Sequence, residues 1–234
     1  PCTAPQLLDN SSLKVSTVAS PARIRSFPMT AAAAHPHPSL SSLKVLVLAA
    51  GQGQRFTASG GRTHKLQASL FDKPVLQHVL DTVADAGLQA FVVRPDGAAT
   101  AGMGDSIASG VRATSDASGW LILPGDMPLV HAATLRTIAQ QLLSTDRFDA
   151  VQPVCNGQPG HPVGFSAPCA AALQQLTGDQ GARSVLQQLR CQGRVVQLPV
   201  EDPGILQDID TLDDLQRAQA VLEQGALVRP LPTP

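Results

Sequence analysis

The first candidate for chemistry is a glycine-bearing loop that directly follows an apolar, β-prone run. The loop reads Leu48-Ala49-Ala50-Gly51-Gln52-Gly53-Gln54-Arg55-Phe56. Small residues let backbone N–H groups approach a phosphate closely, an arginine holds phosphate oxygens through two N–H groups, and a lysine adds a point charge. Because Arg55 lies in this loop and Lys65 lies shortly after it, the segment predicts a cradle for a triphosphate, with Gly51 and Gly53 supplying backbone donors.

The same loop disfavours two common nucleotide-binding motifs. A dinucleotide fingerprint requires a third glycine where Phe56 stands, and an acidic residue at the end of the second strand, where Val93-Arg94-Pro95 stands. A P-loop requires a Gly-Lys-Ser/Thr triplet after the glycines, and this sequence has none there. The loop is therefore not expected to bind NAD or FAD. The alternative that Gly51 and Gly53 only turn the chain tightly stays open.

Acidic residues at two distant places are candidate ligands of a divalent cation. Asp126 follows a strand-like run, so it is expected at the carboxyl end of a strand, where a hard carboxylate suits Mg²⁺. Asp208 and Asp210 are two residues apart, which puts both side chains on the same side of an extended segment. For Asp126 the alternative is a turn former after Pro124-Gly125.

Alternating apolar runs and amphipathic segments predict the elements that position these residues. A continuous apolar run over 44–49 is typical of a strand buried on both faces, and Pro74 and Gly87 flank an amphipathic helix. Further strands are predicted over 89–93, 120–123, 150–154, 161–165 and 194–198, and further helices over 105–113, 132–143, 170–176, 182–190 and 212–223. This order indicates an α/β fold, a three-layer sandwich with a mostly parallel central sheet.

Composition limits the classes of function. Of 234 residues, 43% are apolar, enough for a sizeable core, while 17 basic and 18 acidic residues give a net charge of −1. No broad basic surface is expected to bind nucleic acid, and no apolar run is long enough to span a bilayer. The four cysteines form no CxxC pair, which favours free thiols and a cytoplasmic location.

The two ends of the chain are expected to lie outside the fold. Residues 1–42 are rich in proline, serine and alanine without sustained periodicity, which predicts a flexible leader. The prolines near the other end predict a loose tail over 226–234, so one domain is expected over 43–225. A start at Met29 is a simpler account of the leader than a targeting segment.

The glycine loop becomes more specific when it is read with five other segments in order. These are Gly102-Met-Gly-Asp-Ser106, Pro124-Gly-Asp-Met-Pro128, Gly160-His-Pro-Val-Gly-Phe165, Gly178-Asp-Gln-Gly-Ala-Arg183 and Asp208-Ile-Asp-Thr-Leu-Asp-Asp-Leu215. The ordered set resembles the MobA-like nucleotidyltransferases, most closely the molybdenum cofactor cytidylyltransferases, over residues 43–222. This resemblance implies a Rossmann-like fold of the nucleotide-diphospho-sugar transferase type.

The resemblance also assigns roles to residues. It implies a nucleotide site that includes Leu48, Ala49, Ala50, Gly51, Gly53, Arg55, Lys65, Met103, Gly104 and Ser106. It makes Asp126 a Mg²⁺ ligand together with a carboxylate of the Asp208–Asp210 stretch, and Arg55, Lys65 and Asp126 the catalytic residues. Gly160, His161 and Pro162 resemble the acceptor-side segment, although a hydrogen-bonded loop histidine is an equal alternative.

The activity that the resemblance implies is transfer of CMP from CTP to a molybdopterin-type molybdenum cofactor, with release of pyrophosphate. Ala50 gives Leu-Ala-Ala-Gly where guanylyltransferases usually carry Leu-Ala-Gly-Gly, which favours CTP over GTP. A molybdoenzyme that receives the cofactor is a possible partner. The alternatives are a GTP-dependent guanylyltransferase, a sugar or polyol nucleotidyltransferase, and a non-catalytic module that binds the nucleotide or cofactor as a chaperone.

Overall fold

The structure is a computed structural model that describes residues 39–94, 102–144 and 146–228. Most of the predicted leader, including Met29, and the prolines after residue 228 lie outside the described residues. The short 3₁₀ helix η1 (Leu40–Ser42) falls inside the predicted leader, directly before the first strand.

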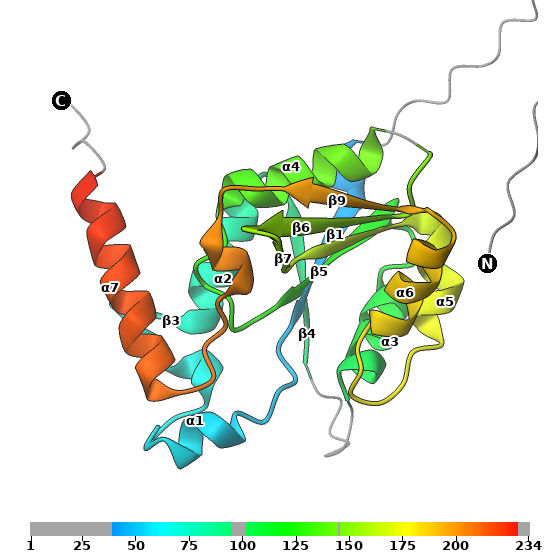
Figure 1. The fold of residues 1–234 in the computed structure, drawn as a ribbon. Coiled ribbons are helices and arrows are strands. Elements are labelled where there is room, and N and C mark those ends of the chain that lie inside the picture. The colour runs from blue at the N-terminus through cyan, green and yellow to red at the C-terminus, as the bar shows by residue number, and fades with distance from the viewer. Residues whose placement is uncertain (1–38, 95–101, 145, 229–234) are drawn as a thin grey trace, which may run out of the picture. The chain divides into compact units, whose positions relative to one another are not determined.

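Strands and helices alternate along the described chain (Figure 1). The strands are β1 (Leu43–Leu48), β2 (Ser69–Leu70), β3 (Lys73–Pro74), β4 (Gln89–Val93), β5 (Gly119–Pro124), β6 (Ala150–Cys155), β7 (Gln158–Pro159), β8 (Val163–Ser166) and β9 (Val195–Pro199). The α-helices are α1 (Gln54–Ala58), α2 (Val75–Asp85), α3 (Met103–Ala113), α4 (Ala132–Leu143), α5 (Ala170–Gln174), α6 (Arg183–Cys191) and α7 (Leu212–Val228). Further 3₁₀ turns are η2 (Lys65–Gln67), η3 (Ala167–Cys169) and η4 (Pro203–Leu206).

Seven strands form one mixed sheet that is mostly parallel, as predicted. The order is β4-β1-β5-β8-β6-β7, with β9 paired to β6. The pairs β1–β4, β1–β5 and β6–β9 are parallel, whereas β8 runs antiparallel between β5 and β6. Strands β2 and β3 form a separate antiparallel pair.

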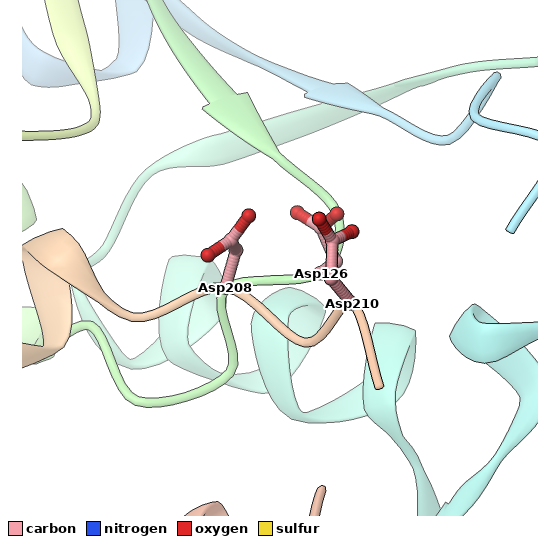
Figure 2. Close-up of side chains that lie close together, drawn as sticks. All are labelled: Asp126, Asp208 and Asp210. Carbon is pink, nitrogen blue, oxygen red and sulfur yellow. The ribbon is translucent and has the colours of Figure 1, made fainter. Parts of the chain in front are cut away.

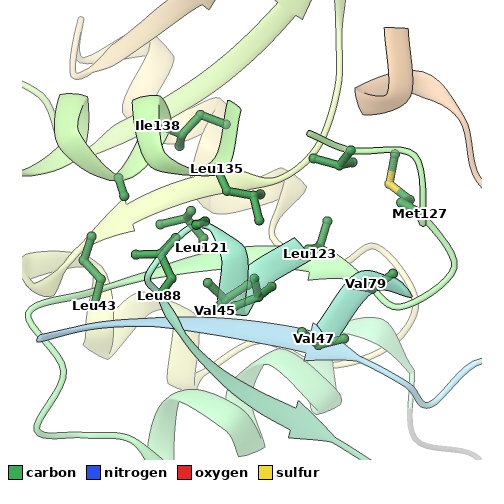
Figure 3. Close-up of a cluster of buried hydrophobic side chains, with 14 of the residues drawn as sticks. Leu43, Val45, Val47, Val79, Leu88, Leu121, Leu123, Met127, Leu135 and Ile138 are labelled. Carbon is green, nitrogen blue, oxygen red and sulfur yellow. The ribbon is translucent and has the colours of Figure 1, made fainter. Parts of the chain in front are cut away.

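Alternate residues of β1 face two different layers of helices. Val45 and Val47 point into a core with α2 and α4, where Leu135 and Ile138 are fully buried (Figure 3). Leu46 and Leu48 belong to the core on the opposite face, which α3, α5 and α6 cover. Because each fully buried branched side chain contributes about 1.5–3 kcal/mol, burial on both faces accounts for the uninterrupted apolar run. The predicted three-layer α/β sandwich is confirmed.

Four predicted element boundaries were wrong by two residues or more. Helix α3 begins at Met103, not at residue 105, and α7 continues to Val228, past the predicted end at 223 and into the predicted tail. The predicted strand over 161–165 begins at Val163, so His161 and Pro162 precede it. Helix α5 ends at Gln174, two residues before the predicted end. None of these shifts changes the order of elements.

Three cysteines, Cys155, Cys169 and Cys191, are free thiols. Burial raises the pKa of the Cys169 thiol to about 11, so this sulfur is protonated at neutral pH. Cys2 lies outside the described residues. Among the helices of the described ranges, none is long and apolar enough to cross a membrane.

Candidate active site

The candidate site lies at the carboxyl ends of two adjacent parallel strands. Leu48 at the end of β1 pairs with Pro124 at the end of β5, and the Gly125 N–H donates to the Leu48 carbonyl at 2.9 Å. The glycine loop and Asp126 therefore leave the sheet side by side. From β1 the chain runs through α2 to β4 on one side of β1, and then through α3 to β5 on the other side. Such a reversal of strand order is where open α/β sheets bind ligands.

The glycine loop is shaped by one left-handed residue and one histidine. Gly53 has φ 63°, a conformation that glycine adopts without steric cost, and it precedes the short helix α1, whose second residue is Arg55. His64 contacts the Gly51 carbonyl through Nε2 at 2.7 Å, and its Nδ1 accepts from the Leu66 N–H at 3.3 Å. His64 therefore connects the loop to η2, which carries Lys65. Sequence analysis missed this structural role.

The segments after β5 and before α7 lie against each other. The Ile209 N–H donates to the Asp126 carbonyl at 2.9 Å, between the two other candidate carboxylates. Gly204 lies so close to the opposing backbone that a Cβ on it would be 2.1 Å from the Leu129 carbonyl oxygen. These contacts bring residues from distant parts of the chain to one place.

Asp202 hydrogen-bonds to both of these segments. Its carboxylate is buried and accepts from the His131 N–H, the Thr134 hydroxyl and the Gly204 N–H at 2.9, 2.6 and 3.0 Å. It therefore caps η4 and joins it to the start of α4, which holds the chain that leads to Asp208. Sequence analysis assigned no role to Asp202 or His131.

Five charged side chains meet at this junction. Lys65 Nζ lies 2.6 Å from Asp126 Oδ2 and 2.7 Å from Asp210 Oδ1, and Arg55 donates to Asp210 Oδ2 at 2.8 Å. Figure 2 shows Asp126, Asp208 and Asp210 gathered from two stretches of the chain. The predicted catalytic residues and the predicted metal ligands thus form one cluster, and their roles remain predictions.

Burial and neighbouring charges shift the pKa values of three residues of the cluster, Lys65, Asp208 and Asp210. Burial alone would lower the pKa of Lys65, but the carboxylates of Asp126 and Asp210 outweigh it and raise that pKa. The hydrogen bond from Lys65 lowers the pKa of Asp210, and Arg55 lowers it further. Burial, together with the charges of Asp126 and Asp210, raises the pKa of Asp208. The cluster is a set of strongly interacting charges that an added cation would rearrange.

The three carboxylates fit a divalent metal ion. One oxygen from each of Asp126, Asp208 and Asp210 can be chosen so that all lie within 4.8 Å of one another. Asp126 Oδ1 is buried and has no hydrogen-bond partner in the described part of the chain. A buried carboxylate oxygen without a partner is costly, and a hard cation such as Mg²⁺ would satisfy it.

A cavity of about 890 Å³ opens in front of the cluster and contains most of the predicted nucleotide-binding residues. Its lining includes Leu48, Ala50, Gly51, Gly53, Arg55, Lys65, Met103, Ser106, Asp126, Asp208 and Asp210. Ala49 and Gly104 do not line it; a Cβ on Gly104 would be 2.7 Å from the Thr177 carbonyl oxygen. Gln52, Gln54, Gly102, Pro124 and Asp179 also line the cavity, and none of them was predicted.

Met103 precedes the predicted helix over 105–113, but it is the first residue of α3, and Ser106 also lies in the first turn of this helix. Ser106 is buried, and its hydroxyl donates to the Gly102 carbonyl at 3.1 Å. The hydroxyl is therefore engaged within its own helix. Met103 is 44% exposed and contributes an apolar surface to the cavity.

A smaller cavity of about 310 Å³ adjoins the first. Gly160 and His161 line it, whereas Pro162 does not, and both cavities are lined by Met103, Pro124, Asp126 and Asp208. Burial lowers the pKa of His161, so its ring is neutral at pH 7, and its Nδ1 has no partner among the described residues. The carboxylate cluster therefore stands where the predicted nucleotide side and the predicted acceptor side meet.

Comparison with known proteins identifies the fold family. The model of the MobA-like NTP transferase domain matches residues 45–194, which include most of β1, the glycine loop, Lys65 and Asp126. The chain belongs to this family. The resemblance inferred from the ordered motifs is thereby confirmed at the level of the family.

The regions that match curated relatives make up only part of each relative's chain. The bifunctional protein GlmU of Acidithiobacillus ferrooxidans is 33% identical over 116 residues, which are 42% of this chain and 25% of GlmU. The purine catabolism protein PucB of Bacillus subtilis is 33% identical over 119 residues, 48% of this chain and 54% of PucB. The chain thus spans a quarter of GlmU and about half of PucB.

Several solved structures match most of this chain in fold. Rv0371C of Mycobacterium tuberculosis in complex with manganese has a TM-score of 0.56 and 26% identity, covering 77% of this chain and 98% of that one. A nucleotidyl transferase from Methanothermobacter has a TM-score of 0.65 at 22% identity, covering 78% and 98%. Molybdopterin-guanine dinucleotide biosynthesis protein A from Archaeoglobus fulgidus has a TM-score of 0.52 at 20% identity, covering 77% and 99%. The last two support the fold alone.

Proposed function

We propose that this MobA-like protein is a nucleotidyltransferase that transfers CMP from CTP to the terminal phosphate of a molybdopterin-type cofactor. The observation that carries the proposal is the charged cluster of Arg55, Lys65, Asp126, Asp208 and Asp210 between two cavities. A reaction that joins two phosphates gathers much negative charge in one place, so its catalyst must chiefly neutralise and align that charge.

The reaction requires no general base from the protein. A phosphate oxygen of the acceptor, already ionised at neutral pH, attacks the α-phosphorus of CTP. The bond between the α-phosphorus and the oxygen bridging to the β-phosphate breaks, and pyrophosphate leaves with the electron pair. The histidine with a lowered pKa, His161, lines the acceptor-side cavity and is not needed to remove a proton.

Arg55 and Lys65 are proposed to bind the triphosphate. Arg55 is 82% exposed at its side chain and makes a single ion pair with Asp210, so most of its N–H groups are available to phosphate oxygens. Lys65 is nearly buried beneath the glycine loop, within contact of two carboxylates. A triphosphate offers both cations oxygens that compete with those of Asp126 and Asp210.

Asp126 and Asp210, with Asp208, are proposed to hold a divalent cation, and Mg²⁺ is the ion whose preference for oxygen ligands fits best. When bound, such an ion neutralises charge on the phosphates and orients them. The manganese complex of the related Rv0371C is consistent with a metal-dependent site. His161 and Gly160 are proposed to contact the acceptor, since the unpartnered Nδ1 of His161 is free to bond a ligand.

The proposed preference for CTP rests on Ala50, which lines the larger cavity. Melting curves of the protein with Mg²⁺ and each of CTP, GTP, UTP and ATP test this preference, because a bound nucleotide raises the melting temperature by mass action. We expect the largest rise with CTP. A larger rise with GTP would assign the protein as a guanylyltransferase instead.

Pyrophosphate release with CTP and molybdopterin tests the reaction itself. Replacement of Asp126 by alanine is expected to lower turnover at least about 1,000-fold, because several kcal/mol of charge stabilisation are lost. The fold should persist, since Lys65 loses its ion pair with Asp126 but keeps the one with Asp210, and circular dichroism measures this. Exposed Asp116 provides a matched control, and Asp116→Ala should retain full activity.

Two outcomes would overturn parts of the proposal. Turnover by Asp126→Ala within tenfold of the wild-type rate would remove Asp126 from the metal site. Tight binding of CTP and molybdopterin by the wild-type protein without any release of pyrophosphate would identify a non-catalytic binding module. Turnover with a sugar phosphate in place of molybdopterin would change the acceptor and keep the nucleotidyltransferase assignment.

A further inference from the structure

Asp179 places a fourth carboxylate in the larger cavity, apart from the candidate metal ligands. It lies in the loop between α5 and α6 and lines the cavity together with Gly102, Met103 and Ser106. It is exposed and makes no hydrogen bond or ion pair with any described residue. The group of carboxylates close enough to share a cation contains Asp126, Asp208 and Asp210 but not Asp179.

The loop that carries Asp179 is held firmly against the start of α3. Asp105 Oδ2 accepts from the Gly102 N–H at 3.0 Å and from the Gly178 N–H at 2.9 Å, and the Gly104 N–H donates to the Gly178 carbonyl at 2.7 Å. The two backbones touch so closely that a Cβ on Gly102 would lie 2.3 Å from the Gly178 carbonyl carbon. These contacts hold the backbone next to Asp179 in place without any ligand.

The carboxylate of Asp179 lies directly over the start of α3. Its Oδ1 is 2.6 Å from the place that a Cβ on Gly102 would take. Gly102, Met103, Ser106 and Asp179 form one wall of the cavity. The Ser106 hydroxyl is already bonded to the Gly102 carbonyl, and Met103 offers an apolar surface. Asp179 is thus the polar side chain of this wall that a ligand can use.

The charge of Asp179 determines which part of a ligand it can face. A carboxylate accepts hydrogen bonds and repels phosphate, so it cannot contact the triphosphate that we place beside Arg55 and Lys65. The nucleoside is then the part that reaches this wall. Two neighbouring hydroxyls match the two oxygens of a carboxylate, and a carboxylate on ribose hydroxyls is a common solution in α/β nucleotide sites. Leu48, Ala50 and Pro124 offer apolar surface for the base.

We propose that Asp179 accepts hydrogen bonds from the ribose hydroxyls of the bound nucleoside triphosphate and thereby selects ribonucleotides over deoxyribonucleotides. The inference rests on the proposed nucleotide site, but not on the identity of the acceptor. It gives the Gly178-Asp-Gln-Gly-Ala-Arg183 segment a role at the nucleotide that sequence analysis did not assign.

The test compares the dissociation constants of CTP and 2′-deoxy-CTP, measured calorimetrically with Mn²⁺ and without acceptor. Hydrogen bonds to a charged group imply that the wild-type protein binds CTP at least about tenfold more tightly than 2′-deoxy-CTP. In Asp179→Ala this ratio should fall to about one, because CTP loses its bonds from both hydroxyls, whereas 2′-deoxy-CTP loses only the bond from its 3′-hydroxyl. Gln180→Ala, on the neighbouring exposed residue, is the matched control and should keep the wild-type ratio.

Each other outcome has a distinct meaning. The same CTP to 2′-deoxy-CTP ratio in the wild-type protein and in Asp179→Ala would overturn the inference and leave the nucleotide site intact. An unchanged ribose ratio with an altered CTP to UTP ratio would overturn it in favour of a contact with the base. Failure of the wild-type protein to bind any nucleoside triphosphate would refute the proposed function, and with it this inference.

Discussion

Replacing Lys65 by methionine is expected to strengthen the binding of a divalent cation in the absence of nucleotide. Lys65 Nζ lies 2.6 and 2.7 Å from oxygens of Asp126 and Asp210, so it occupies the space beside two proposed metal ligands. A cation bound to the same oxygens would stand roughly 4 Å from the ammonium group. At that separation two unit charges repel by about 1 kcal/mol in water and about 4 kcal/mol near a protein surface.

The cluster opens onto a large cavity but Lys65 is nearly buried, so the value in water, doubled for a divalent ion, is the smallest gain to expect. The expected gain is therefore at least about 2 kcal/mol, or about 30-fold in the dissociation constant of Mn²⁺. The electron paramagnetic resonance signal of free Mn²⁺ measures this constant directly. Lys73→Met is the control, because Lys73 pairs with Asp81 on the surface and should not affect the site.

The variant should also lose coupling between metal and nucleotide. In the wild-type protein CTP gives Lys65 new phosphate partners and so should tighten Mn²⁺ binding, while in Lys65→Met this gain should shrink. An Mn²⁺ affinity that is unchanged or weaker in Lys65→Met would refute the reasoning. It would mean that Lys65 gathers the carboxylates for the ion and does not compete with it.

Two further predictions concern the scaffold. A hydrogen bond from Arg194 holds the pKa of Asp149 below its ordinary value of 3.8, so its stabilising effect is complete above about pH 4 and is lost as pH falls below it. In urea unfolding Asp149→Asn should therefore be clearly less stable than wild type at pH 7, and this deficit should shrink as pH falls below about 4; a deficit independent of pH would contradict this. Gly204→Ala should lose about 1–3 kcal/mol, because its Cβ would meet a carbonyl oxygen at 2.1 Å. Gly51→Ala, with its nearest neighbour at 4.0 Å, should retain wild-type stability, and equal losses would contradict the steric argument.

The order of elements could be predicted because it depends on local patterns. The apolar run of β1 and the spacing of apolar residues in α2 are set by burial on two faces and on one face, respectively. Elements without such a pattern were missed. Helix α1 has five residues and is capped by left-handed Gly53, not by a serine, threonine or aspartate, while β2, β3 and β7 have two residues each. Two residues cannot display a period.

The site residues that could be predicted are those whose charge alone indicates what they can bind. Arg55, Lys65 and Asp126 were chosen for charge and position after strands, and the structure brings them together. Asp179 was missed because its place depends on contact between two glycine-rich segments far apart in sequence. Ser106 was expected near the nucleoside, but a buried hydroxyl in the first turn of a helix finds its partner in the backbone of that turn.

The charges that line the larger cavity imply that metal and nucleotide must bind together. Its lining contains two cations, Arg55 and Lys65, and four carboxylates, those of Asp126, Asp179, Asp208 and Asp210, which sum to a formal charge of −2. The glycine loop alone suggests a positive cradle, whereas the assembled cavity would repel a triphosphate. We expect a divalent cation among three of the carboxylates to cancel that charge and to free Lys65 for phosphate. The proposed nucleotide site would then bind a triphosphate only when the metal is present.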